Sequence, residues 1–155
     1  MKKIIAVDID DTLGEYHQTF LEFYNATYNT KFKKDDFCHI EWEKTWGISQ
    51  EEMILRTIAF DKSGAKERIA PRQGAQEMIK KLAKSHILHI VTNRPIEIKA
   101  NTEWWIEKYF PGKFTDMHFC GKGSKIIRSK STVCKNIRAP ILLEDHYRNA
   151  HACAN

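Results

Sequence analysis

A short apolar strand that ends in two carboxylates constrains this chain more than any other feature. Residues 4–8 read Ile-Ile-Ala-Val-Asp, and Asp10 follows two positions after Asp8. A brief run rich in β-branched residues predicts a strand buried inside a parallel sheet. Carboxylates are costly in such a place unless they are paired or bind a metal. Because ligands bind at the carboxyl ends of strands in open α/β sheets, we expect Asp8 and Asp10 to carry chemistry.

The length and composition indicate one globular domain with a small insertion. The chain has 155 residues, of which 42% are apolar, enough to fill a core. The apolar run near the N-terminus is too short for a signal peptide, and no run approaches the ~20 residues of a membrane span. We therefore expect a soluble cytoplasmic protein with no membrane partner. The cysteines show no metal-ligand spacing, so free thiols are expected at Cys38, Cys120, Cys134 and Cys153.

Strand and helix patterns alternate along most of the chain. Strand signals lie at 4–8, 86–91, 115–120 and 140–144. Helical spacing of apolar residues predicts helices at 74–84, 96–109 and 130–137. This alternation is typical of an α/β fold with a parallel sheet between two layers of helices. The predicted core comprises residues 1–14 and 71–155.

Residues 15–70 break this alternation and show no convincing strand. Residues 16–28 have a helical pattern, and Ser49-Gln50-Glu51-Glu52 fits a capping box that opens a second helix. We interpret 15–70 as a small helical cap, inserted after the first strand and lying over the carboxyl end of the sheet. Its aromatic residues either stack on a substrate base or fill the core of the cap. The residues considered for stacking are Phe20, Trp42 and Trp46.

A second signal, Thr92-Asn93-Arg94-Pro95, directly follows the strand predicted at 86–91. The threonine hydroxyl can hydrogen-bond a phosphoryl oxygen, and the guanidinium of Arg94 can pair with phosphate through two N–H groups. Pro95 suits the start of a helix. The alternative is an ordinary strand-to-helix turn that Thr92 caps.

Two more signals flank the last predicted strand. Lys130 opens the helix before it, where a cation can neutralise a phosphate and keep an acidic nucleophile ionised. Lys125 competes for the same role. Glu144 and Asp145 end the strand, and one of them would complete a magnesium site with Asp8 and Asp10, because Mg²⁺ prefers hard oxygen ligands. An acidic pair that caps a helix is the alternative.

Together these motifs resemble the haloacid dehalogenase superfamily of aspartate-nucleophile phosphohydrolases. The first motif is Asp8-Ile9-Asp10-Asp11-Thr12, and the others are Thr92, Lys130 and Glu144-Asp145. Within the superfamily, the helical insertion and Thr-Asn-Arg-Pro most resemble the 5'(3')-deoxyribonucleotidase-like branch. The resemblance covers nearly the whole chain and implies a Rossmann-like core with a cap.

The resemblance also implies a mechanism. Asp8 would attack a phosphomonoester and form an aspartyl-phosphate, while Asp10 would protonate the leaving alcohol and later activate water. Thr92 and Lys130 would bind the phosphoryl group, with Asn93 and Arg94 beside them. The cofactor would be Mg²⁺, with the ligands Asp8, the carbonyl of Asp10, Asp145 and a supporting Glu144. The substrate would be a small phosphorylated molecule, a nucleoside monophosphate foremost.

Two other functions stay open at this point. The first is a phosphatase for sugar phosphates or nucleic-acid ends. From Gly121 to Arg138 there are six basic residues and no acid, which suits nucleic acid or is simply a solvated face. The second is a non-catalytic binding or regulatory protein on the same fold. Because ten residues follow Asp145, we also expect the strand at 140–144 to lie at a sheet edge, through which a homo-oligomer could form.

Overall fold

A computed structural model describes residues 2–36, 45–121 and 128–154 and divides the chain into two compact units. Unit 1 comprises Met1–Gly14 and Pro71–Asn155, and unit 2 comprises Glu15–Ala70. Two sequence positions singled out above, Trp42 and Lys125, lie outside the described residues.

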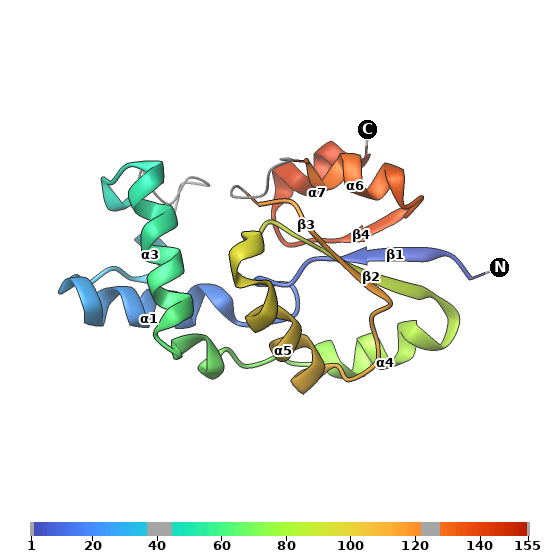
Figure 1. Ribbon diagram of the computed structural model, residues 1–155, viewed down its shortest axis with the longest axis horizontal. Coiled ribbons are helices and arrows are strands. Elements are labelled where there is room, and N and C mark those ends of the chain that lie inside the picture. Colours follow the sequence, from blue (N-terminus) through green and yellow to red (C-terminus); the bar gives the residue numbers. More distant parts are fainter. Residues whose placement is uncertain (1, 37–44, 122–127, 155) are drawn as a thin grey trace. The chain divides into compact units, whose positions relative to one another are not determined.

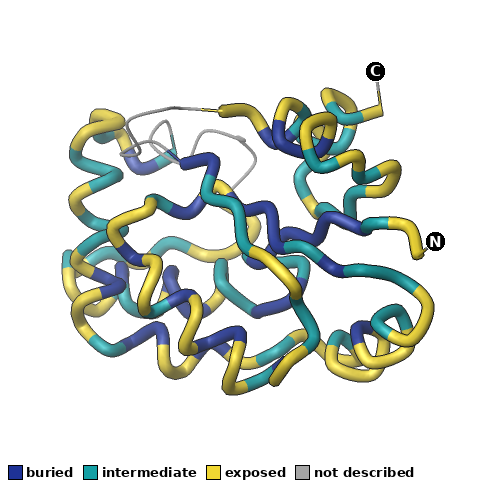
Figure 2. Tube along the Cα trace, turned by 45° about the vertical axis from the view of Figure 1, so that its right-hand side comes forward, coloured by how far each residue is buried: buried dark blue, intermediate teal, exposed yellow. Residues whose placement is uncertain are grey.

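The centre of unit 1 is a parallel sheet in the order β3-β2-β1-β4. Its strands are β1 (Ile4–Val7), β2 (Ile87–Thr92), β3 (Asp116–Phe119) and β4 (Ile141–Leu143). Ile5 of β1 pairs with Leu88 on one side and with Ile141 on the other. The residues buried on both faces of β1 explain its uninterrupted apolar run, and the tube is darkest in this region (Figure 2). The predicted parallel α/β sheet is confirmed.

Helices cover both faces of this sheet, which gives unit 1 its three layers (Figure 1). Below the sheet in that view are α4 (Ala75–Ser85) and α5 (Lys99–Tyr109), and above it are α6 (Lys130–Asn136) and α7 (Tyr147–Ala154). The helix predicted at 96–109 starts as a 3-10 turn, Ile96–Ile98, before α5. Within the described ranges, no helix combines the length and apolar character needed to cross a membrane.

A compact apolar cluster joins the sheet to α6 and α7. Its buried members are Ala6, Val91, Cys120, Val133 and Cys134. Cys153 of α7 packs against this cluster, and the three cysteines that the structure describes are free thiols, as predicted. Cys38 lies outside the described residues.

Strand β4 lies at one edge of the described sheet, because its only partner among the described strands is β1. Ile141, the first residue of this strand, is 42% exposed. The edge position agrees with the expectation from sequence, and self-association through it remains a prediction.

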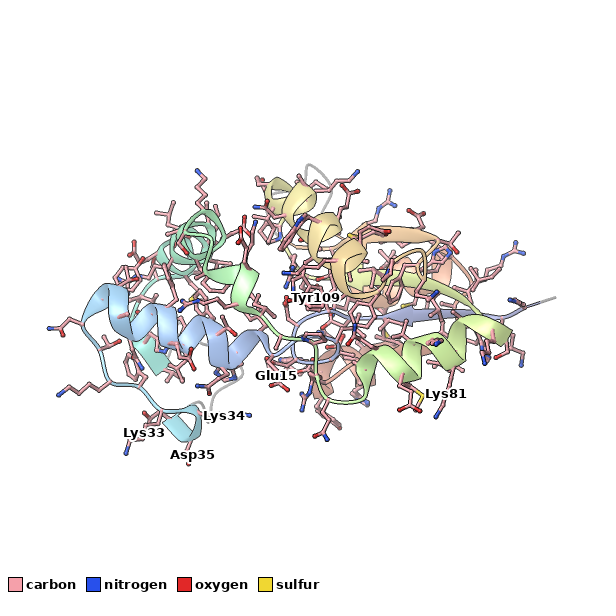
Figure 3. The ribbon with its side chains drawn as sticks, turned by 90° about the horizontal axis from the view of Figure 1, so that it is seen from below. Glu15, Lys33, Lys34, Asp35, Lys81 and Tyr109 are labelled. Carbon is pink, nitrogen blue, oxygen red and sulfur yellow. The ribbon has the colours of Figure 1, made fainter. Side chains whose placement is uncertain are left out.

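Unit 2 is helical. It contains α1 (Tyr16–Tyr28), α3 (Gln50–Lys62) and the 3-10 turns Lys34–Asp36 and Ala65–Arg68. The hydroxyl of Ser49 accepts a hydrogen bond from the Glu52 N–H at 3.2 Å, which is the N-cap that the sequence predicts for α3. Figure 3 labels the exposed residues Lys33, Lys34 and Asp35 at the first of these turns.

Aromatic side chains form the core of unit 2. The ring of Trp46 stacks on Tyr24 with centroids 4.0 Å apart and on Phe20 at 5.4 Å. Phe20 also meets Phe60 edge to face at 5.0 Å. Phe20 is fully buried and Trp46 is 7% exposed. Of the two interpretations of these rings, this geometry favours the one in which they fill the core of their own unit.

Candidate active site

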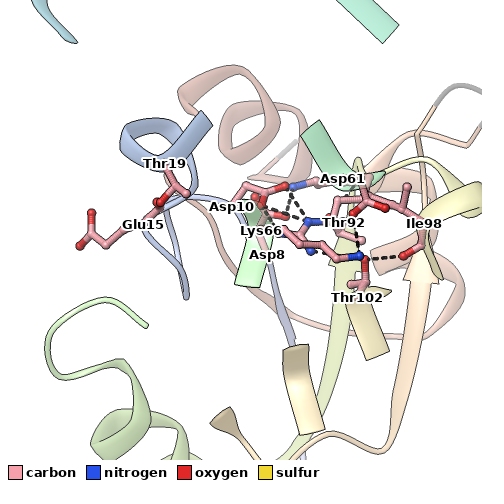
Figure 4. Close-up of polar contacts among 11 residues, drawn as sticks. Asp8, Asp10, Glu15, Thr19, Asp61, Lys66, Thr92, Ile98 and Thr102 are labelled. Carbon is pink, nitrogen blue, oxygen red and sulfur yellow. Dashed lines mark hydrogen bonds and ion pairs between the residues drawn. The ribbon is translucent and has the colours of Figure 1, made fainter. Parts of the chain in front are cut away.

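A tight turn after β1 positions the two aspartates of the first motif. The Asp8 N–H continues the ladder to β4 by donating to the Leu143 carbonyl at 2.9 Å. The Ile9 carbonyl then accepts the N–H groups of Leu13 and Gly14, at 2.8 and 3.0 Å. Asp11 takes a positive φ of 54° inside this turn, a conformation that aspartate tolerates better than most residues. Asp8 and Asp10 therefore project side by side from the end of the strand (Figure 4).

Lys130 contributes a positive charge to the site. Its Nζ lies 2.7 Å from Oδ1 of Asp8 and 2.7 Å from Oε2 of Glu144. All three side chains are nearly inaccessible, with 2%, 8% and 1% exposure for Lys130, Asp8 and Glu144. Lys130 begins α6, directly after Ser129, whose hydroxyl caps the helix by accepting the Thr132 N–H at 3.1 Å. These contacts place Lys130 beside the acidic residue whose ionisation the sequence predicts it to support, while its binding of phosphate stays a prediction.

The ionisation of Asp8 is finely balanced. Burial raises the pKa of Asp8 to about 7, with Lys130 opposing this shift and Glu144 and Asp10 adding to it. Burial alone lowers the pKa of Lys130, but the carboxylates of Asp8 and Glu144 together raise it above its ordinary value. Lys130 therefore stays charged and provides one positive charge for two buried carboxylates.

Asp8, Glu144 and Asp145 form a cluster of oxygen donors. One carboxylate oxygen from each lies within 4.8 Å of the others. Thr12 of the first motif donates to Oδ1 of Asp145 at 3.3 Å and so fixes its orientation. Burial and the neighbouring Glu144 raise the pKa of Asp145. A donor set of hard oxygens with excess negative charge fits Mg²⁺, which usually takes one or two carboxylates and keeps several waters.

Arg94 donates hydrogen bonds to the carboxylate of Asp10. Its Nη2 lies 2.6 Å from Oδ1 of Asp10, and its Nε lies 3.1 Å from both carboxylate oxygens. The guanidinium is buried and also donates through Nη1 to the Thr102 hydroxyl at 3.3 Å. Thr102 in turn donates to the carbonyl of Ile98 at 3.0 Å (Figure 4). The sequence analysis assigned Arg94 to phosphate, which stays a prediction; its partner in the structure is Asp10.

Thr92 and Asn93 end β2 beside this pair. Thr92 is fully buried, and its hydroxyl oxygen accepts the Arg94 N–H at 3.2 Å. Accepting this bond leaves the hydroxyl hydrogen able to donate. Asn93 is exposed. The turn that Thr92 stabilises was the alternative interpretation of this motif, and it is compatible with phosphate binding by the same hydroxyl.

Two residues that support the site were not found from the sequence. Thr102 anchors Arg94 from α5, and its only sequence signal is a small polar residue on the buried side of a helix. Gly121 follows β3, and a Cβ there would lie 2.1 Å from the Asn93 carbonyl oxygen and 2.6 Å from that of Arg94. Only glycine allows this approach of two loops.

Comparison with known families assigns the chain. The family described as 5' nucleotidase, deoxy (pyrimidine), cytosolic type C protein matches residues 2–153. The chain belongs to this family. The assignment confirms the deoxyribonucleotidase branch of the haloacid dehalogenase superfamily and identifies this nucleotidase-family chain as a phosphatase.

Curated relatives agree with the family assignment. A 5'(3')-deoxyribonucleotidase of Bacillus subtilis (strain 168) is 29% identical over 157 residues, covering 96% of this chain and 79% of the relative. A 5'(3')-deoxyribonucleotidase of Bacillus phage SPbeta matches with the same identity and coverage.

Solved structures share the fold at low sequence identity. A haloacid dehalogenase-like family hydrolase from Streptococcus pneumoniae has a TM-score of 0.71 at 13% identity, covering 98% of this chain and 80% of that one. A magnesium-bound structure described as a haloacid dehalogenase hydrolase from Bacillus subtilis has a TM-score of 0.50 at 19% identity, covering 77% of this chain and 65% of that one. At these identities the likeness shows the fold.

Proposed function

We propose that this phosphatase hydrolyses nucleoside monophosphates, deoxyribonucleotides foremost, by transferring the phosphoryl group to Asp8. The observation that carries the proposal is the buried Asp8 carboxylate, 2.7 Å from Lys130 and within 4.8 Å of the oxygens of Glu144 and Asp145. A buried carboxylate in this setting is poorly solvated and therefore reactive. The names of the curated relatives supply the substrate class.

Asp8 is the nucleophile in this proposal. One of its carboxylate oxygens forms a bond to phosphorus while the bond from phosphorus to the ester oxygen breaks. Lys130 favours the anionic form of this carboxylate, because its Nζ contacts Oδ1 directly and opposes the effect of burial. The products of this step are an aspartyl-phosphate and the leaving alcohol, which must receive a proton.

Asp10 supplies that proton and then removes one from water. General acid–base catalysis of this kind contributes roughly 10²–10⁴-fold to the rate. Arg94 acts as a positioning residue, because its contacts of 2.6 and 3.1 Å fix the direction of the Asp10 carboxylate. In the second step, water activated by Asp10 attacks phosphorus, which restores Asp8 and releases phosphate.

The transferring phosphoryl group needs donors and positive charge. Lys130 supplies a charge, and the Thr92 hydroxyl supplies a hydrogen-bond donor at the end of β2. Asn93 is exposed beside it and offers an amide. Electrostatic stabilisation by such preorganised groups is usually the largest part of catalysis.

The oxygen donors fit Mg²⁺ as cofactor. The ligands would be Asp8, Asp145, the backbone carbonyl of Asp10 and, in support, Glu144. Bound there, Mg²⁺ would neutralise negative charge on the phosphoryl group. The neighbour from Bacillus subtilis described as magnesium-bound has the same fold and supports this choice. A cytosolic location, as in the description of the family, is part of the proposal.

Phosphate release from a panel of phosphomonoesters tests the proposal and its alternatives. The panel contains 5'- and 3'-deoxynucleotides, ribonucleotides, sugar phosphates and 3'-phosphorylated oligonucleotides, each with and without Mg²⁺. We expect Mg²⁺-dependent phosphate release that is fastest with deoxynucleoside monophosphates. Faster phosphate release from oligonucleotide ends, with a steep salt dependence, would instead indicate that the substrates are nucleic-acid ends.

Two variants make the panel decisive. Asp8→Asn is expected to lose turnover on every substrate. Asp11→Asn is the matched control: it removes the carboxylate that follows Asp8 and Asp10 in the sequence and is expected to keep turnover. Folded wild-type protein that releases phosphate from no substrate would favour the non-catalytic alternative.

A further inference from the structure

A second group of metal-ligating side chains lies on the sheet, away from the acidic cluster. His89 of β2 is in register with Asp116 of β3, and Val91 is in register with His118. Side chains alternate along a strand, so His89, Asp116 and His118 project from one face. It is the face that α6 and α7 share, because Val91 belongs to the apolar cluster there. His89 precedes Thr92 by three residues, about 10 Å along the strand.

The donor atoms of this group converge. Nδ1 of His89 lies 3.1 Å from Nε2 of His118, and the two rings are stacked with centroids 5.4 Å apart and 16° between their planes. Oδ2 of Asp116 lies 3.5 Å from Nε2 of His118. One donor atom from each of the three residues lies within 4.8 Å of the other two.

We propose that His89, Asp116 and His118 form a second cation site, which takes a divalent late transition-metal ion, Zn²⁺ foremost. Zinc bonds to nitrogen and oxygen are about 2.0–2.2 Å, so two ligand atoms of a tetrahedral site lie about 3.3 Å apart. The observed 3.1 and 3.5 Å match that separation. Two imidazoles and one carboxylate suit Zn²⁺ rather than Mg²⁺, with water as the fourth ligand.

The surroundings of the site suit an exchangeable ion. The side chain of Asp116 is 59% exposed and that of His118 is 24% exposed, so an ion can reach the donors from solvent. Burial and the neighbouring His118 lower the pKa of His89, which keeps its imidazole in the neutral form that binds metals. An ion here would join β2 to β3 without touching Asp8, so the proposal is independent of the proposed function.

Zinc titration of the metal-stripped full chain tests the site. The titration is run in excess Mg²⁺, which competes with Zn²⁺ for the oxygen donors of Asp8, Glu144 and Asp145. We expect one Zn²⁺ per chain and at least a tenfold weaker affinity in His89→Gln and in His118→Gln. The matched control His151→Gln, an exposed histidine of α7, is expected to bind as the wild type does. Asp145→Asn and Cys153→Ser are also expected to bind normally, because neither contributes a ligand.

A measurement on the unchanged protein removes any dependence on how the variants fold. Long-range ¹H–¹⁵N spectra resolve the imidazole nitrogens of the seven histidines. Zinc is expected to shift the resonances of His89 and His118 and to leave the other five in place. The proposal is overturned if Zn²⁺ shows no saturable binding, if other histidines respond instead, or if Cys153→Ser or Asp145→Asn abolishes binding. In those cases the three residues form only a network of polar contacts.

Discussion

Arg94 holds Asp10 through its Nη2, 2.6 Å from Oδ1, and its Nε, 3.1 Å from both carboxylate oxygens. The arginine comes from the loop after β2, and the aspartate comes from the turn after β1. Bidentate pairs of this kind fix geometry as well as charge. The proposed acid–base residue is therefore oriented by a residue that the sequence motif alone assigns to phosphate.

Arg94→Lys is expected to lower kcat by roughly tenfold or more while KM changes less. Lysine keeps the charge but not the fork that orients Asp10, and general acid–base catalysis supplies roughly 10²–10⁴-fold. Steady-state kinetics with a deoxynucleoside monophosphate measure kcat and KM separately. Arg138→Lys, at an exposed arginine after α6, is the control and should be neutral. A large rise in KM at constant kcat would instead indicate that Arg94 binds phosphate.

Asp8→Asn is expected to stabilise the metal-free protein at pH 8. The pKa of Asp8 is about 7 in the folded chain, against 3.8 as the ordinary value. Between these values the folded state binds more protons than the unfolded state, so the stability of the wild type falls as pH rises from about 4 to 7. The Asp8→Asn variant does not lose stability in this way. We expect its free energy of unfolding to exceed that of the wild type by ~1 kcal/mol or more at pH 8, and the difference to vanish near pH 4. Each kcal/mol corresponds to a rise in Tm of about 2–4 °C.

Thermal unfolding in a chelator at both pH values measures this difference. Asp11→Asn, which leaves the buried pair of Asp8 and Lys130 intact, is again the control. A Tm of Asp8→Asn that lies below the wild-type value at pH 8 would contradict the interpretation that burial of the Asp8 carboxylate costs stability.

Lys130→Met is expected to destabilise the protein by about 3 kcal/mol at pH 8, because it leaves two buried carboxylates without their cation. The loss should be smaller at pH 6, because burial raises the pKa of Asp8 to about 7 and this carboxyl can then take up a proton. Urea denaturation at both pH values gives the two free energies of unfolding. Lys135→Met, on the exposed side of the same helix, should change the stability by less than about 0.5 kcal/mol. Equal losses in both variants would show that the effect arises from the helix rather than from the charge.

Gly121→Ala is expected to destabilise unit 1 by about 1–3 kcal/mol and to lower kcat, because the added Cβ would meet the Asn93 carbonyl at 2.1 Å. The loop that carries Thr92 and Arg94 must then move. Gly112→Ala separates the clash from backbone strain: Gly112 has φ 61° with nothing within 4 Å of the added Cβ. That control should lose stability without losing activity. Full activity in Gly121→Ala would show that the loop tolerates displacement.

The fold and the acidic end of the site were predictable because both follow from periodicity and topology. The strand signals of the sequence fall on all four described strands, the apolar run of β1 being the clearest, and the Ser49 capping box identified α3. Parallel strands present their carboxyl ends at one edge of the sheet, so motifs after β1 and β4 had to meet. That rule brings Asp8 and Glu144 together on either side of Lys130.

The remaining features depend on side-chain directions that no local pattern encodes. A guanidinium suits carboxylate and phosphate equally, so the partner of Arg94 could not be read from the motif. The aromatic spacing of α1 is the same whether a ring stacks on a ligand or on Trp46. The need for glycine at position 121 arises from a carbonyl 28 residues earlier, at Asn93, which becomes its neighbour only in the folded chain.

Detection of a phosphoryl group on Asp8 tests the central claim most directly. Rapid acid quenching of the wild type during turnover of a deoxynucleoside monophosphate with Mg²⁺ should trap this intermediate, because acid stops its hydrolysis. Mass spectrometry of the peptides is predicted to find one added phosphoryl group on the peptide that contains Asp8, and none in Asp8→Asn. Phosphate release by the wild type with the label on another residue, or on none, would contradict the account.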